Sequence, residues 1–141
     1  MIATAYAVAL SCLSLNVYHE ARNQSVLGQE AVALVTMNRA GWQDKNICPE
    51  VVKKKQFSWT TDKVYKVKNH YKLRKAGYPN EKIAWVNSVA IATKVMKHKV
   101  PDFTKGATYY HTTGVSPYWV NQKKQTIRLG AHIFYKEKEN L

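Results

Sequence analysis

The sequence predicts an α+β fold that is mainly helical and carries a small β element near its C-terminal end. Long apolar segments with helical spacing occupy much of the first hundred residues. The last forty residues instead gather Tyr, Thr, Ile and Phe, which favour strands. With 141 residues and no internal repeat or low-complexity segment, residues 1–141 are expected to form one domain.

The first predicted helix covers residues 3–23, where Tyr6, Leu10, Leu13 and Val17 lie on one stripe. The second covers 27–40. Its middle is apolar on every side, which is typical of a buried helix.

Three further helices are expected from their end signals. Pro49 can open a short helix that runs to residue 54. Residues 62–76 follow a cap at Thr60-Thr61-Asp62 and end before Gly77. Residues 81–99 follow Asn80, which can cap the helix, and end before Pro101.

The β element is expected in three short pieces. Residues 107–112 are predicted to be a strand, and residues 114–117 a turn. Residues 126–129 and 132–135 are predicted to be short strand or turn segments.

The charge balance predicts a polyanionic partner and makes carboxylates scarce. Lys and Arg number 22 and Asp and Glu 9, so the formal net charge is 22 − 9 = +13. Such a charge attracts nucleic acid, an anionic membrane or an anionic cell wall. Any chemistry that needs a carboxylate must use one of nine: Glu20, Glu30, Asp44, Glu50, Asp62, Glu81, Asp102, Glu137 and Glu139.

The cysteine and apolar patterns exclude other classes. Cys12 and Cys48 cannot build a disulfide framework, and neither sits in a C-x-x-C pair that would suggest zinc. Cys12 is expected in the core, and whether it pairs with Cys48 stays open. No uncharged apolar run reaches 18 residues, so no transmembrane span is predicted. The N-terminus resembles the apolar part of a signal peptide but lacks a preceding Lys or Arg.

Glu20 continues the apolar stripe of the first helix. A carboxyl group on such a stripe is desolvated, which raises its pKa and suits it to general acid catalysis. The alternative is a structural glutamate that pairs with Arg22 or Arg39. Tyr18 and its polar neighbours at this helix end are groups that a sugar-binding cleft needs.

Several motifs together resemble the SleB-like cell wall hydrolases. These are Tyr18-His19-Glu20-Ala21-Arg22, Gly28-Gln29-Glu30-Ala31-Val32-Ala33, Asn38-Arg39, Ile47-Cys48-Pro49, Gln56-Phe57-Ser58, Ala107-Thr108-Tyr109-Tyr110-His111 with Trp119, and Gly130-Ala131-His132-Ile133-Phe134-Tyr135. Each motif alone is weak, but their order is maintained from about residue 14 to residue 136.

The resemblance implies a lysozyme-like fold and cleavage of the β-1,4 bond between N-acetylmuramic acid and N-acetylglucosamine. Glu20 matches the family's catalytic glutamate. Gln56, Tyr109, Tyr110 and His111 match positions expected to line the cleft. Because a strand alternates its faces, only one of the two tyrosines should point into it. Trp119 can stack on a sugar or pack at an edge.

One departure bears on the mechanism. The family usually continues Glu-Ala-Arg with Gly-Glu, whereas this chain has Asn23-Gln24. No convincing second carboxylate remains, although Glu30 could approach from the next helix. A mechanism with a single catalytic acid is therefore expected. Such a mechanism favours the lytic transglycosylase reaction over the lysozyme reaction, in which a water molecule attacks.

Other classes stay open as alternatives. A glucosaminidase or zinc amidase would also attack the wall, but the five histidines show no H-E-x-x-H spacing and no cofactor is expected. A nucleic-acid binder could use the Lys-rich residues 45–75, where Lys63, Lys66, Lys72 and Lys75 would line a basic helix, but no recognised motif is present.

The expected biological setting follows from the architecture, since the sequence shows no wall-binding repeat and no convincing export signal. The chain is expected to act as a monomeric phage endolysin without a separate wall-binding domain. It would be made in the cytoplasm and act on peptidoglycan in the periplasm or cell wall, helped by attraction to an anionic wall or outer-membrane surface. The alternative hypothesis is a bacterial cell wall hydrolase. No specific nucleic-acid partner is expected.

Overall fold

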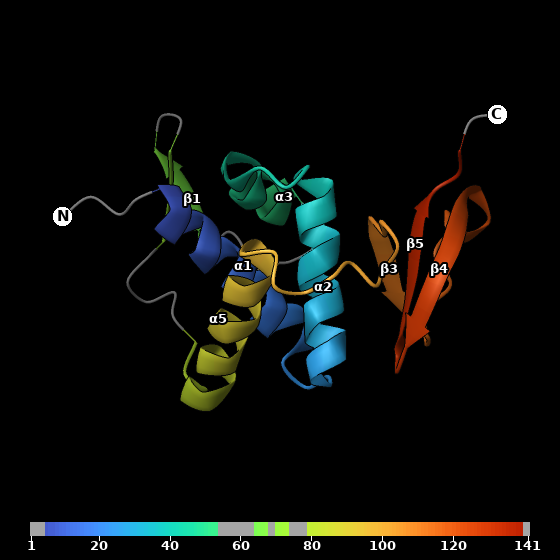
Figure 1. The fold of residues 1–141 in the computed structure, drawn as a ribbon, viewed down its shortest axis with the longest axis horizontal. Coiled ribbons are helices and arrows are strands. Elements are labelled where there is room, and N and C mark those ends of the chain that lie inside the picture. Colours follow the sequence, from blue (N-terminus) through green and yellow to red (C-terminus); the bar gives the residue numbers. More distant parts are fainter. Residues whose placement is uncertain (1–4, 54–63, 68–69, 74–78, 140–141) are drawn as a thin grey trace.

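The computed structural model describes residues 5–53, 64–67, 70–73 and 79–139, and its elements are drawn in Figure 1. In chain order they are α1 (Ala5–Ala21), α2 (Val26–Arg39), the 3₁₀ helix η1 (Asp44–Asn46), α3 (Ile47–Lys53), β1 (Val64–Val67), β2 (His70–Leu73), α5 (Lys82–Met96), β3 (Tyr109–Thr112), the 3₁₀ helix η3 (Val120–Gln122), β4 (Lys123–Leu129) and β5 (His132–Glu137). The helices gather on one side and the β3–β5–β4 sheet on the other.

Helix α1 lies at the centre of the helical part. It contacts α2, α3 and α5, and every residue from Cys12 to Tyr18 is buried. The predicted stripe is therefore only part of its buried surface. At its outer end Tyr6 is 38% exposed, because the packing partners cover the later turns of the helix.

Cys12 and Cys48 form a disulfide that joins α1 to α3, with 5.3 Å between their Cα atoms. Cys12 lies in the core as expected, and both residues belong to the main apolar cluster. The bond closes a loop of 36 residues and so restricts the unfolded chain.

Helix α2 is buried from Gly28 to Met37, as its apolar middle predicts. Ser25 caps it by accepting a hydrogen bond from the Gly28 N–H at 3.2 Å. A Cβ atom at Gly28 would lie 3.0 Å from Cβ of Gln24, so a glycine lets the α1–α2 connection fold tightly over the helix start.

The predicted helix over 62–76 is wrong in the part that the structure describes. Strands β1 and β2 pair there as an antiparallel hairpin, with Lys66 opposite Tyr71 and Tyr65 opposite Lys72. Val and Tyr prefer extended backbone, and this preference outweighs the helix-end signals. The expected basic helix surface is lost with it, and Lys63 and Lys75 lie outside the described residues.

Helix α5 confirms the predicted helix over 81–99, with shorter ends. Its N-cap is Glu81 rather than Asn80, and no side chain caps it. The short helix expected from Pro49 begins two residues earlier, at Ile47.

The C-terminal sheet is antiparallel in the order β3–β5–β4. Its inner face packs on α2, where Ala107 and Phe134 join Ala31 and Val35 in a second apolar cluster. The sheet therefore sits beside the helix that follows Glu20, as Figure 1 shows.

Candidate active site

Glu20 is the penultimate residue of α1 and has a buried Oε1 atom. Its carboxylate lies close to the hydroxyl of Tyr110 on β3, close enough for its charge and hydrogen bonding to raise the pKa of Tyr110. The residues are 90 positions apart in the chain, so the contact joins the helical part to the sheet. A carboxyl group held by a neutral donor beside partly exposed surface is suited to proton transfer.

Tyr110 faces inward because of the sheet register. It lies opposite Phe134 of β5, and both side chains pack toward α2. Burial raises the pKa of Tyr110 well above its usual value, and the charge and hydrogen bond of Glu20 raise it further. The hydroxyl therefore stays protonated and serves as a donor near neutral pH.

The end of α2 anchors the start of this strand. Asn38 donates from Nδ2 to the Ala107 carbonyl at 3.0 Å and to Oδ2 of Asp102 at 3.0 Å, while its Oδ1 accepts from Trp42 at 2.9 Å. Arg39 donates from Nη1 to the Thr108 carbonyl at 2.9 Å. These contacts fix the backbone that precedes Tyr110, so the Asn-Arg motif positions the donor for Glu20.

We expect Asn38→Ala to lower the free energy of unfolding by about 2–3 kcal/mol, because it removes three partly buried hydrogen bonds and leaves their partners unsatisfied. Lytic activity should fall as well, since β3 loses its anchor. Urea unfolding checks the stability. The matched control is Asn121→Ala, at an exposed site, which should change stability by less than about 0.5 kcal/mol. Equal stability of the two variants would contradict this role.

The alternative role for Glu20 is a pair with Arg22 or Arg39. Nε of Arg22 lies 3.3 Å from Glu81, and Nε of Arg39 lies 3.2 Å from Glu50. Both arginines therefore have acidic partners on other elements. Arg39 thus forms an ion pair with Glu50 and also donates to the Thr108 carbonyl.

Most other described carboxylates have structural partners. Glu30, considered above as a second acid, pairs with Lys94 of α5 at 3.3 Å, and Glu137 pairs with Lys123 across the sheet. Asp102 accepts from the Thr104 N–H, the Thr104 hydroxyl and the Gly106 N–H, so it organises the loop before β3. Sequence reasoning missed this role of Asp102, for which only its place after Pro101 was a signal.

Tyr109, His111 and Trp119 lie on the opposite face of the sheet from Tyr110. Trp119 packs against Tyr109, His111 and Tyr135, with ring centroids 5.3, 5.8 and 5.3 Å away. Nε2 of His111 lies 2.9 Å from the Tyr135 hydroxyl. These predicted cleft residues form an aromatic cluster and do not join Glu20 and Tyr110. As alternation requires, the two tyrosines point to different faces.

Tyr18 lies below the helix end rather than on the surface. It is 6% exposed, packs edge-on against Trp85, and carries the guanidinium of Arg22 4.7 Å above its ring. The Tyr18 ring therefore packs under the Arg22 guanidinium and helps to hold it in place. Gln56, the remaining predicted cleft residue, lies outside the described residues.

His132 is buried against the ring of Tyr110, with 5.4 Å between ring centroids. Burial lowers the pKa of His132, so the imidazole is neutral around pH 7. Within the described ranges no three His, Cys, Asp or Glu side chains are grouped as a metal site would require. No helix described here is long and apolar enough to span a membrane.

Comparisons with known proteins cover most of the chain. A solved structure, the catalytic domain of the Bacillus cereus SleB protein, is similar with a TM-score of 0.64 and 23% identity, over 92% of this chain and 90% of that one. This similarity confirms the predicted fold class, a mainly helical lysozyme-like domain with a small sheet. Among proteins with curated descriptions, none matches.

The family comparison is decisive for the class of protein. The Cell Wall Hydrolase family matches residues 23–135, which begin three residues after Glu20. The role of Glu20 therefore rests on its surroundings and not on the matched segment. The chain belongs to the Cell Wall Hydrolase family and is an enzyme that acts on the cell wall.

Proposed function

We propose that this enzyme cleaves the β-1,4 bond between N-acetylmuramic acid and N-acetylglucosamine in peptidoglycan, with Glu20 as its single general acid. The observation that carries the proposal is the approach of the buried Tyr110 hydroxyl to the Glu20 carboxyl, whose charge raises the pKa of Tyr110. It places a hydroxyl from a distant element beside one carboxylate, where the hydroxyl can act as a donor. Structural partners hold Glu30, Glu50, Glu81, Asp102 and Glu137.

The proton steps follow from this pair. Protonated Glu20 gives its proton to the glycosidic oxygen as the bond to the muramic acid anomeric carbon breaks. The carboxylate left behind is stabilised by the Tyr110 hydroxyl. It then takes a proton from the attacking group, which is either the C6 hydroxyl of the same sugar or a water molecule. The first route forms a 1,6-anhydro product, and the second gives a reducing end.

The absence of a second acid at Gln24 favours the anhydro route. Oε1 of Gln24 lies 3.8 Å from the point where a Cβ atom on Gly130 would stand, so this side chain reaches the β4–β5 turn. An amide there cannot act as the base or nucleophile that a two-carboxylate glycosidase needs. The lytic transglycosylase reaction is therefore proposed ahead of the lysozyme reaction.

Mass spectrometry of digested peptidoglycan tests the bond and the route. We expect fragments ending in 1,6-anhydro-N-acetylmuramic acid. Reducing N-acetylmuramic acid ends would keep the bond but replace the route by hydrolysis. Reducing N-acetylglucosamine ends, or free peptides with intact glycan strands, would contradict the proposal.

The setting is proposed on the same basis. A net charge of +13 attracts the enzyme to an anionic wall or outer-membrane surface. The Cys12–Cys48 disulfide supports action outside the reducing cytoplasm, in the periplasm or wall. We propose that the enzyme acts as a monomer and lyses host cells as a phage endolysin. Lysis of permeabilised cells that falls as salt rises would support the electrostatic part.

A further inference from the structure

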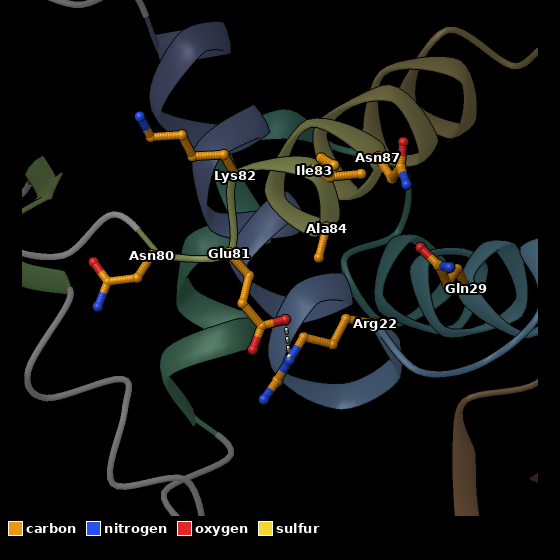
Figure 2. Close-up of a pocket in the computed structure, with 8 residues that line it drawn as sticks. All are labelled: Arg22, Gln29, Asn80, Glu81, Lys82, Ile83, Ala84 and Asn87. Atoms are coloured by element: carbon orange, nitrogen blue, oxygen red, sulfur yellow. Dashed lines mark ion pairs between the residues drawn. The ribbon is translucent and has the colours of Figure 1, made fainter.

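A hollow of about 720 Å³ opens where three helix ends meet, beside the end of α1 that carries Glu20. Figure 2 shows its lining: Arg22 follows α1, Gln29 lies in α2, Asn80 and Glu81 precede α5, and Lys82, Ile83, Ala84 and Asn87 belong to the first two turns of α5. We refer to this site as the α5 hollow. Two residues span at most about 7 Å of chain, so Arg22 keeps the hollow close to Glu20.

Gln29 gives the α5 hollow a buried polar group. The residue is 8% exposed, and its Nε2 donates to the Gln24 carbonyl at 3.1 Å. Its Oε1 atom is buried and has no hydrogen-bond partner among the described residues. A buried amide oxygen without a donor is unfavourable by about 1–3 kcal/mol, so a ligand N–H that reached it would be bound well.

The charges on the wall of the α5 hollow leave one cation available. Glu81 pairs with Arg22 at 3.3 Å, as Figure 2 shows, so these two charges offset each other. Lys82 lines the same hollow and has no acidic partner in the described part of the chain. The hollow therefore favours a ligand that carries a carboxylate.

The remaining lining is mixed. Ile83 is 81% exposed beside Ala84, which gives an apolar surface, and Asn87 adds an amide one turn along α5. A cation, three side-chain amides from Gln29, Asn80 and Asn87, and a small apolar surface together suit a short peptide with amide groups, methyl side chains and a free carboxylate. They suit the sugar without its peptide less well, since N-acetylmuramic acid freed of its peptide keeps a lactyl carboxylate but has no series of amides and methyl side chains.

We propose that the α5 hollow binds the peptide stem attached to the lactyl group of N-acetylmuramic acid. This inference rests on the proposed function, in which that sugar lies at Glu20. A stem N–H donates to Oε1 of Gln29, a stem carboxylate pairs with Lys82, and a methyl side chain contacts Ile83. The enzyme therefore prefers strands that carry peptides over strands from which the peptides have been removed.

The test compares cleavage rates on peptide-bearing glycan strands and on strands stripped by an amidase. The wild-type enzyme should cleave the peptide-bearing strands faster. Lys82→Ala should lower the ratio of the two rates about fivefold, the loss expected for one exposed, charge-assisted hydrogen bond. Lys97→Ala is the matched control, because Lys97 is an exposed lysine that follows the other end of α5. It should leave the ratio unchanged.

A binding measurement separates this inference from the catalytic proposal. Glu20→Gln protein is titrated with muramyl dipeptide and with N-acetylmuramic acid, while NMR follows the Gln29 side-chain amide. Saturable shifts with the dipeptide alone are expected, and Lys82→Ala in the same background should weaken them. Equal shifts with both probes, or an unchanged rate ratio in Lys82→Ala, would overturn the stem site. An enzyme that cleaves neither type of strand would contradict the proposed function, and the titration would still test the hollow.

Discussion

Glu20→Gln should lose lytic activity by about 100- to 10,000-fold and remain folded, since a positioned general acid contributes about 10²–10⁴ to the rate. Glutamine keeps the volume of the side chain, and its amide oxygen can still lie beside the Tyr110 hydroxyl. It has no proton to give to the glycosidic oxygen. Turbidity loss of a peptidoglycan suspension measures the activity, and thermal unfolding should show a change in stability below about 1 kcal/mol.

The same substitution elsewhere provides the control. Glu137 lies in an exposed pair with Lys123 on the far strands, and Glu137→Gln should keep activity near that of the wild type. Glu20→Asp, which shortens the acid by one methylene, keeps a titratable group but misplaces it, so it should also be strongly impaired. Near-normal lysis by Glu20→Gln would remove Glu20 from the mechanism.

The helical part of the fold was predictable because local signals agree with the packing there. The middle of α2 is apolar on all sides and is in fact buried throughout. The end signals around residues 62–76 pointed to a helix. Val64, Tyr65 and Tyr71 favour strands, however, and pair in a hairpin. Where helix-end signals and residue preferences conflict, pairing with another part of the chain decides the secondary structure of the segment. No local sequence pattern reveals that pairing.

The candidate site was predictable only in part for the same reason. Strand alternation predicts that Tyr109 and Tyr110 face opposite ways. Which tyrosine lies beside Glu20 depends on the pairing of β3 with β5, where Tyr110 lies opposite Phe134. It also depends on the hydrogen bond from Asn38 to the Ala107 carbonyl. These contacts join residues far apart in sequence. The aromatic residues His111 and Trp119 share the motif with Tyr110, but they follow the opposite face of the sheet.

Tyr110→Phe should lower kcat about 10- to 100-fold with a smaller change in KM, because a hydrogen bond to a charged group contributes about 1.5–3 kcal/mol. The hydroxyl donates most strongly to Glu20 once the acid has given up its proton, so its effect is concentrated in the transition state. The phenylalanine ring preserves the packing against Phe134 and His132. The variant should therefore fold normally.

The pH profile gives a readout that loose packing would not produce. A donor to the ionised carboxylate favours ionisation, so its removal should move the basic limb of the kcat/KM profile to higher pH. Tyr6→Phe, at the exposed start of α1, should leave both the rate and the profile unchanged. Tyr109→Phe removes a hydroxyl from the other face of the sheet and should have a smaller effect than Tyr110→Phe. The reverse order would mean that the outer face of the sheet, and not the contact between β3 and α1, binds the reacting sugar.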